Sequence, residues 1–223
     1  MSSQPLQAVS APRRVLATRN AGWARAFAHW LGERGARPNA VSMAGVVFAV
    51  AASAALYVAP GFTRSAQAAL LLAAAVCIQL RLLCNLLDGM LAVEGGFKSK
   101  LGDIYNDLPD RVADVCILVG AGYSIRSLPF GVTLGWAAAV LALFTAYVRL
   151  LGGALGGTQH FIGPMAKQHR MFTLTVFTLL AGFEAFGGTP PHAMRIGLSV
   201  IVAGSIVTAF RRTSLIAAEL EAR

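Results

Sequence analysis

The acidic residues of this sequence are concentrated in one stretch. All five aspartates fall between Asp88 and Asp114. Residues three or four apart share a face of a helix, so one narrow stripe of a helix here holds Asp103, Asp107, Asp110 and Asp114. Upstream, Asn85 and Asp88 lie three residues apart and share a face of a second helix. Two such helices can present oxygen ligands across a cleft, and hard divalent cations such as Mg²⁺ prefer oxygen ligands.

The helices that position these residues are predicted to cross a membrane. The chain is 56% hydrophobic and 13% charged, whereas soluble domains carry about a quarter charged residues. Apolar stretches of about 20 residues recur, each long enough to span a bilayer. Gly and Pro mark most of the connections between them. The expected fold is an all-α integral membrane protein whose six transmembrane helices cover residues 41–59, 68–93, 102–125, 129–152, 170–188 and 195–215.

The N-terminal region is expected to differ from the spans. Residues 1–14 are predicted to be disordered, and residues 15–37 an amphipathic helix with Trp23, Phe27 and Trp30 near one face and arginines as its polar partners. Such a helix lies on the membrane surface. Residues 38–218 are then expected to form a single six-helix transmembrane domain that carries these oxygen ligands.

The basic residues predict how the chain is oriented. The net charge is +9, but the basic residues flank apolar spans and form no soluble basic face, so membrane lipids are the expected partners and nucleic acid is not. With the N-terminus in the cytoplasm, cytoplasmic segments hold fourteen Lys and Arg and the opposite side holds three, Arg64, Arg126 and Arg195. We expect a bacterial inner (cytoplasmic) membrane, with the active site facing the cytoplasm.

The spacing of the polar residues resembles a family signature. The CDP-alcohol phosphatidyltransferases carry D-x-x-D-G-x-x-A-R, about eight residues, then G-x-x-x-D-x-x-x-D. Every spacing of that signature is present, with five identities: Asp88, Gly89, Ala92, Gly102 and Asp110. The segment Pro38-Asn39-Ala40-Val41-Ser42 also resembles the family's entry to the first span. Asn85, Asn106 and Val93 depart from the signature, standing where the family has Asp, Asp and Arg.

The resemblance implies an activity and a site. Members move a phosphatidyl-type group from a CDP-linked lipid, here CDP-diacylglycerol, to an alcohol and release CMP, with metal ions (Mg²⁺ or Mn²⁺) on the pyrophosphate and the last aspartate, Asp110, as general base. The implied metal ligands are Asn85, Asp88, Asn106 and Asp110, and Asp107 is a further candidate that could turn in to compensate for the two amides. The implied nucleotide-binding residues are Asp88, Gly89, Ala92, Gly102 and Asn39. Phosphate of the acceptor would be bound by Arg149, Lys167 and Arg170, which the positive charge bias of the cytoplasmic side explains equally well.

The departures leave several alternatives open. Two amides replace two carboxylates, so the sequence predicts a weaker metal site or a single tightly bound metal. A non-catalytic nucleotide- or lipid-binding relative and a membrane cation or proton transporter remain alternatives. The acceptor is open among glycerol 3-phosphate, inositol phosphate, serine and a second lipid. Small-residue spacing in Gly152-Gly153 and Gly156-Gly157 favours close helix packing or a homodimer face.

Overall fold

The computed structural model describes residues 22–94 and 102–222, apart from the side chains of residues 93, 94, 102, 103, 105 and 106. These residues form helices and no strand. The elements are α1 (Gly22–Glu33), α2 (Pro38–Val58), the 3-10 turn η2 (Ala59–Gly61), α3 (Arg64–Glu94), α4 (Gly102–Ser124), α5 (Gly131–Ala154), α6 (Lys167–Gly187) and α7 (His192–Glu221).

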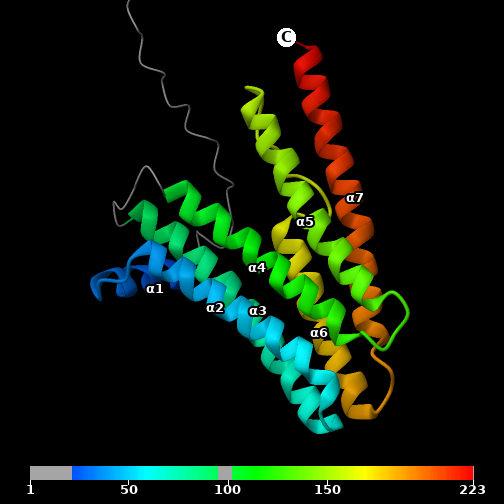
Figure 1. Cartoon of the computed structure of the whole chain (residues 1–223). Coiled ribbons are helices and arrows are strands. Elements are labelled where there is room, and N and C mark those ends of the chain that lie inside the picture. Colours follow the sequence, from blue (N-terminus) through cyan, green and yellow to red (C-terminus); the bar gives the residue numbers. More distant parts are fainter. Residues whose placement is uncertain (1–21, 95–101, 223) are drawn as a thin grey trace, which may run out of the picture.

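Six long helices close into a ring. Around the ring, α2 packs on α3, α3 on α6, α6 on α7, α7 on α5, α5 on α4, and α4 again on α2. Figure 1 shows that α2–α4 lean away from α5–α7 toward the end of the molecule where the C-terminus lies. The polar residues of the sequence motif lie on α3 and α4 at this divergent end, where α6 begins.

The helix boundaries follow from the residues that punctuate the apolar runs. Pro38 begins α2, a position where its missing N–H removes no hydrogen bond. Gly188 ends α6 with a φ of 73°, a left-handed conformation that glycine adopts without strain. Each of the six predicted spans overlaps one of the long helices α2–α7.

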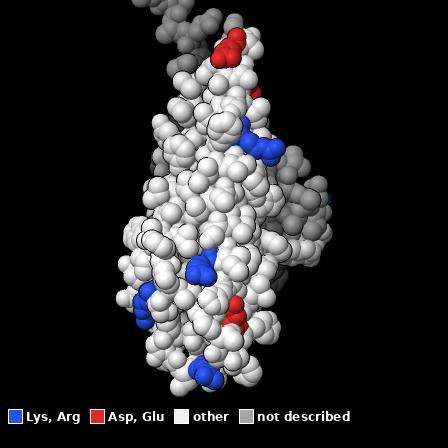
Figure 2. Space-filling view, turned by 90° about the vertical axis from the view of Figure 1, so that its right-hand side faces the viewer, with Lys and Arg blue, Asp and Glu red and all other residues white. Residues whose placement is uncertain are grey.

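The outer surface is that of a membrane protein. Among the described residues, four helices are long and apolar enough to cross a membrane: α2 with η2, most of α3, α5 and α7. Val47, Phe183 and Phe210 are more than half exposed on the outside of the bundle. Figure 2 shows that charged side chains on the face seen there gather toward its two ends, with an uncharged band between. The helices α4 and α6 carry charged side chains of the site and fall outside the set of four.

The first helix packs on the bundle through alanines. Ala24 and Ala28 of α1 are buried against Leu87 and Met90 of α3. The aromatic side chains expected to face the membrane, Trp23, Phe27 and Trp30, are exposed. The predicted disordered segment 1–14, and residues 15–21 of the predicted surface helix, lie outside the described residues. The interfacial position of α1 stays a prediction.

Small residues let the helices approach closely. Two of the four glycines proposed for a dimer face pack inside the chain, Gly152 against Ile216 of α7 and Gly153 against the side chain of Gln159, whereas Gly156 is exposed. The helices α4 and α5 meet at Gly122 and Gly135, where a Cβ added to Gly135 would lie 2.6 Å from the Cα of Gly122. The homodimer stays a prediction, and Gly152 and Gly153 give it no support.

The contact between Gly122 and Gly135 makes a stability prediction. Gly135→Ala should lower the free energy of unfolding by about 1–3 kcal/mol, because the new methyl group meets backbone that can yield only by a helix shift. Thermal unfolding in detergent measures the effect. Gly187→Ala is the matched control, since nothing lies within 4 Å of a Cβ at Gly187. Equal unfolding midpoints for the two variants would contradict the close approach.

Candidate active site

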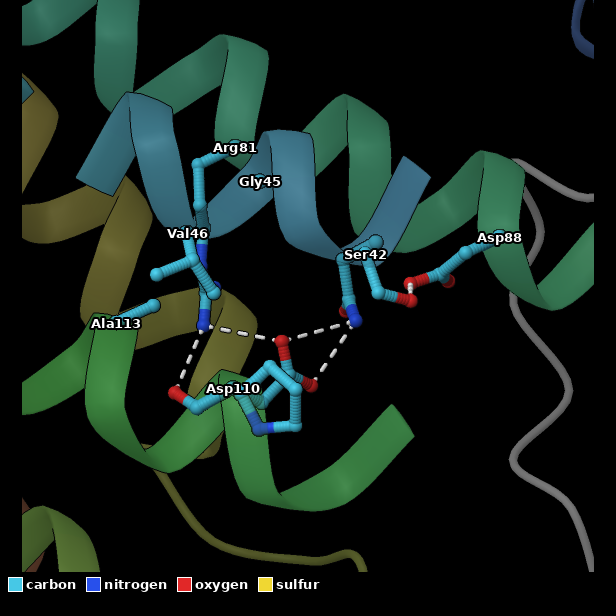
Figure 3. Close-up of a pocket in the computed structure, with 9 residues that line it drawn as sticks. Ser42, Gly45, Val46, Arg81, Asp88, Asp110 and Ala113 are labelled. Carbon is cyan, nitrogen blue, oxygen red and sulfur yellow. Dashed lines mark hydrogen bonds and ion pairs between the residues drawn. The ribbon is translucent and has the colours of Figure 1, made fainter. Parts of the chain in front are cut away.

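A small pocket lies between α2, α3 and α4. Its lining includes Ser42 from α2, Asn85 and Asp88 from α3, and Asp110 from α4, as Figure 3 shows for the labelled residues. The pocket has a volume of ≈ 10 Å³, enough for about one water molecule or small ion. The motif residues of α3 and α4, which are separated in the sequence, therefore meet in this pocket.

Asp88 is the carboxylate of this pocket with an open oxygen. It is 4% exposed, and its Oδ2 accepts a hydrogen bond of 2.6 Å from the Ser42 hydroxyl. Its Oδ1 is buried with no hydrogen-bond partner among the described residues. A buried charged oxygen without a partner is costly, so this atom fits a cation or a hydrogen-bond donor brought by a ligand.

Asn85 joins Asp110 to Lys167. The Asn85 amide nitrogen donates to both carboxylate oxygens of Asp110, at 3.0 and 2.9 Å, and the amide oxygen accepts from the Lys167 ammonium at 2.7 Å. The same ammonium also donates to Asp110 Oδ2. A carboxylate only accepts and an ammonium only donates, so these two neighbours fix which way the amide points.

A cluster of buried ion pairs lies next to the small pocket. The Arg81 guanidinium donates to Asp114 at 2.6 Å and to the Asp110 carboxylate at 3.2 Å, and it also reaches the Asp110 backbone carbonyl (Figure 3). Arg170 of α6 donates to the other oxygen of Asp114 at 2.8 Å. The side chains of Arg81, Asp114 and Arg170 are each 1% exposed. This cluster ties α3, α4 and α6 together beneath the pocket.

Asp107 points to two arginines, Arg111 and Arg149, and not into the small pocket. One of its oxygens accepts from Arg111, one turn along α4, at 3.0 Å and from Arg149 of α5 at 2.9 Å. The Arg149 guanidinium also lies 5.1 Å from the ring centre of Phe161. Asp107 therefore stands on the α5 side of α4 and outside the small pocket, and the alternative that it supplies a metal ligand there gains no support.

A larger cavity of ≈ 180 Å³ adjoins the small pocket. Asn85 and Asp110 line both. Five basic side chains line the larger cavity: Arg111, Arg149, Lys167, Arg170 and Arg212. The three basic residues predicted to bind phosphate are among them, and each pairs with a different aspartate of α4: Arg149 with Asp107, Lys167 with Asp110 and Arg170 with Asp114. Such a cavity is suited to phosphate groups.

The remaining sequence-predicted residues lie around the edge or outside the description. Gly89 and Ala92 are half-buried on the last turns of α3, and Asn39 is exposed in the first turn of α2. None of these three is among the residues that line the two cavities. The side chain of Asn106 lies outside the described residues, and Gly102 is described only as part of the backbone of α4.

Several residues of the site, among them Ser42, Arg81, Arg111 and Arg212, were not predicted from the sequence. Ser42, which bonds Asp88, ends the segment that resembles the family's first-span entry. Arg81 lies four residues before Asn85 and seven before Asp88, so helical spacing alone places it on their face. A charged residue in an apolar span usually faces a partner, and that signal could have found Arg81. Arg212 bonds the carbonyls of Thr145 and Ile162, contacts that only the fold creates.

The donor atoms decide how many divalent cations the site fits. Asp88 Oδ1 is free to ligate, whereas both oxygens of Asp110 already accept from cationic or amide N–H groups. No three His, Cys, Asp or Glu side chains in the described part of the chain come close enough to share an ion. Mg²⁺ is often held by one or two carboxylates together with substrate phosphates. Among the described side chains of the small pocket, Asp88 therefore offers an oxygen to a divalent cation, whereas both oxygens of Asp110 are already engaged.

Comparisons with known proteins agree on the fold. No family model matches the chain. Inner membrane protein YnbA of Escherichia coli (strain K12) is 26% identical over 141 residues, which are 63% of this chain and just under two thirds, 66%, of that protein. The Mycobacterium tuberculosis phosphatidylinositol phosphate synthase PgsA1, in its complex with manganese and citrate, superposes with a TM-score of 0.70 at 22% identity, over 86% of this chain and 88% of that chain. The same protein with CDP-DAG bound also gives a TM-score of 0.70, at 23% identity over 88% of this chain and 94% of that chain. Its apo form gives a TM-score of 0.66 at 22% identity over 84% of this chain and 92% of that chain. Over most of its length, this chain has the fold of a phosphatidylinositol phosphate synthase.

Proposed function

We propose that this chain is a phospholipid-synthesising transferase. It moves a phosphatidyl-type group from a CDP-linked lipid, CDP-diacylglycerol in the first instance, to an alcohol acceptor and releases CMP. The bond that forms joins the acceptor oxygen to the lipid phosphorus, and the bond that breaks joins this phosphorus to the CMP oxygen. One observation carries the proposal: a pocket with an open carboxylate and a cavity lined by five basic side chains meet at Asn85 and Asp110.

Asp88 is the residue that faces the donor's pyrophosphate in this proposal. Its open Oδ1 would hold one divalent cation, Mg²⁺ or Mn²⁺, which neutralises the negative charge on the pyrophosphate. Ser42 fixes the other oxygen of Asp88, so the carboxylate is oriented before the substrate arrives. The manganese and the CDP-DAG in the PgsA1 structures support this part of the proposal by likeness of fold.

The basic cavity is the proposed place of the acceptor. Arg149, Lys167 and Arg170 line it, and guanidinium and ammonium groups bind phosphate strongly where water is partly excluded. Among the open acceptors, this favours glycerol 3-phosphate or inositol phosphate over serine or a second lipid.

Asp110 stands between the two cavities and is the proposed general base. The Asn85 amide nitrogen hydrogen-bonds both Asp110 oxygens, at 3.0 and 2.9 Å. If the Asn85 amide releases one of the two Asp110 oxygens, a lone pair on that oxygen becomes free to take the proton of the acceptor's hydroxyl. Asp110 stays held by Arg81 and Lys167 during this change.

The crowding around Asp110 also favours a second candidate, a relative that binds a nucleotide or lipid without turnover. The two oxygens of Asp110 already accept four hydrogen bonds from side chains, which leaves little room for a substrate hydroxyl to approach them. Such a protein would bind a CDP-linked lipid and release no CMP.

The experiment that separates these candidates measures CMP. The purified protein in liposomes receives CDP-diacylglycerol, Mg²⁺ or Mn²⁺ and one acceptor at a time, with CMP release and new lipid followed by mass spectrometry. Acceptor-dependent CMP release supports the transferase. Binding of CDP-diacylglycerol without CMP supports the inert relative, and cation flux across the liposomes without either would support the transporter alternative and refute the proposal.

The proposed topology has six membrane crossings, α2 to α7, with the site at the cytoplasmic side. The distribution of basic residues along the chain supports this arrangement. Single cysteines placed in the N-terminal segment, in residues 94–101 and at the C-terminus, in a cysteine-free background, are expected not to react with an impermeant reagent in intact cells, whereas a cysteine beside Arg126 is expected to react. Labelling of any of the first three from outside would overturn the orientation.

A further inference from the structure

The Lys167 ammonium stands at the meeting point of two oxygens that the family signature would give to a metal. Asn85 Oδ1 and Asp110 Oδ2 both accept from it, the first at 2.7 Å. Its side chain is 18% exposed, so the ammonium is mostly withdrawn from water. The contact joins the first turn of α6 to both α3 and α4.

We infer that Lys167 takes the place of one divalent cation, and that this chain holds a single metal, at Asp88. A metal between Asn85 and Asp110 would need the two oxygens that already point at the ammonium. The same position cannot hold both cations, because each would occupy the space within bonding distance of the same atoms.

The charges of the residues are matched to this exchange. With aspartate at position 85, as in the signature, two carboxylates would balance one divalent ion. With Asn85, the single charge of Asp110 is balanced by the single charge of Lys167. The substitution of Asn for Asp and the approach of the lysine are therefore matched, because Asn85 removes one negative charge and the ammonium supplies one positive charge where a divalent ion would supply two.

The charges of the surrounding side chains also disfavour a divalent ion at Asp110. Arg81, Lys167 and Arg170 bring three positive charges, and Asp110 and Asp114 bring two negative ones. These five side chains are already one charge positive, which repels a divalent ion at Asp110. Asp88 brings the group to neutrality and is, of these three carboxylates, the one with a buried oxygen that has no partner in the described part of the chain.

The test counts bound Mn²⁺, by electron paramagnetic resonance of the free ion during titration of the purified protein. The wild-type chain is expected to bind one Mn²⁺. Asn85→Asp with Lys167→Gln restores the two oxygens and removes the ammonium, so this double variant is expected to bind a second Mn²⁺ at least about tenfold more tightly than either single variant does. Asn85→Asp alone keeps the lysine, which would pair with the new carboxylate and keep the position filled.

Two controls separate the lysine's position from its charge. Lys167→Arg keeps a cation and should keep the wild-type count of one. Arg149→Gln removes one charge from the same cavity, but Arg149 pairs with Asp107 and not with Asn85 or Asp110, so its count should also stay at one. Unfolding midpoints are recorded for every variant, and counts are compared among folded ones.

The possible results decide the inference. Two Mn²⁺ per wild-type chain would overturn it even if no variant folds, and so would a double variant that binds no more Mn²⁺ than Asn85→Asp. One Mn²⁺ for wild type and Lys167→Arg, with a second in the double variant, supports it. The inference rests on the proposed function for its meaning in catalysis, but the count needs no turnover. A failed CMP assay with a count of one would therefore refute the function and leave the role of Lys167 intact.

Discussion

Asp88→Asn is expected to lower the rate of CMP release by on the order of 10³-fold, comparable to the loss of a group that stabilises charge in a transition state. The reason is that Asp88 holds the one carboxylate oxygen of the small pocket that has no partner in the described part of the chain. The assay is CMP release from CDP-diacylglycerol at saturating acceptor, together with a Mn²⁺ titration, which should show the loss of the bound ion.

The stability of the same variant separates a functional from a structural role. Asp88 is buried and one of its oxygens is unsatisfied, so replacing the charge by an amide should leave the unfolding midpoint unchanged or raise it. Ser42→Ala is the control, because it leaves Asp88 in place and removes the hydroxyl that orients it and that also contacts the Pro38 carbonyl, and its loss of rate should be about 10–100-fold. If Asp88→Asn keeps wild-type turnover, the assignment of Asp88 as the metal-holding residue is wrong.

Asp114→Asn is expected to have the largest effect on stability, a loss of about 3–5 kcal/mol in the free energy of unfolding. Its carboxylate pairs with Arg81 on one oxygen and with Arg170 on the other, and all three side chains are 1% exposed. An amide cannot balance two guanidinium charges that are out of reach of water. Denaturant unfolding of the purified protein, followed by far-UV circular dichroism, measures the change.

Asp107→Asn is the matched control for this prediction. It makes the same chemical change on the same helix, but Asp107 is 35% exposed, and exposed ion pairs contribute about 0–1 kcal/mol. Asp114→Glu keeps the charge and should recover part of the lost stability. Equal losses for Asp114→Asn and Asp107→Asn would show that the buried cluster does not hold α3, α4 and α6 together.

The sequence by itself determined the helices and three of the residues that meet in the small pocket, Asn85, Asp88 and Asp110. Apolar runs of bilayer length, separated by Gly and Pro, set where α2 to α7 begin and end, because these signals act within a few residues of the chain. The i, i+3 spacing of Asn85 and Asp88 placed them on one face for the same local reason. The spacing of the family signature then indicated that Asp110 would face them, as it does.

The tertiary structure alone decided which charge pairs with which. The stripe of aspartates on α4 was predicted to point one way, yet Asp107 turns to Arg149 of α5 while Asp110 and Asp114 turn to Arg81 of α3. A helix that packs between two others divides even a narrow stripe between them. Lys167 meets Asn85 across 82 positions of sequence, and no periodicity reports such a contact. The number of cations that the site can hold depends on that contact, because an ammonium brought in by the packing of α6 on α3 occupies the oxygens that the motif alone would assign to a metal.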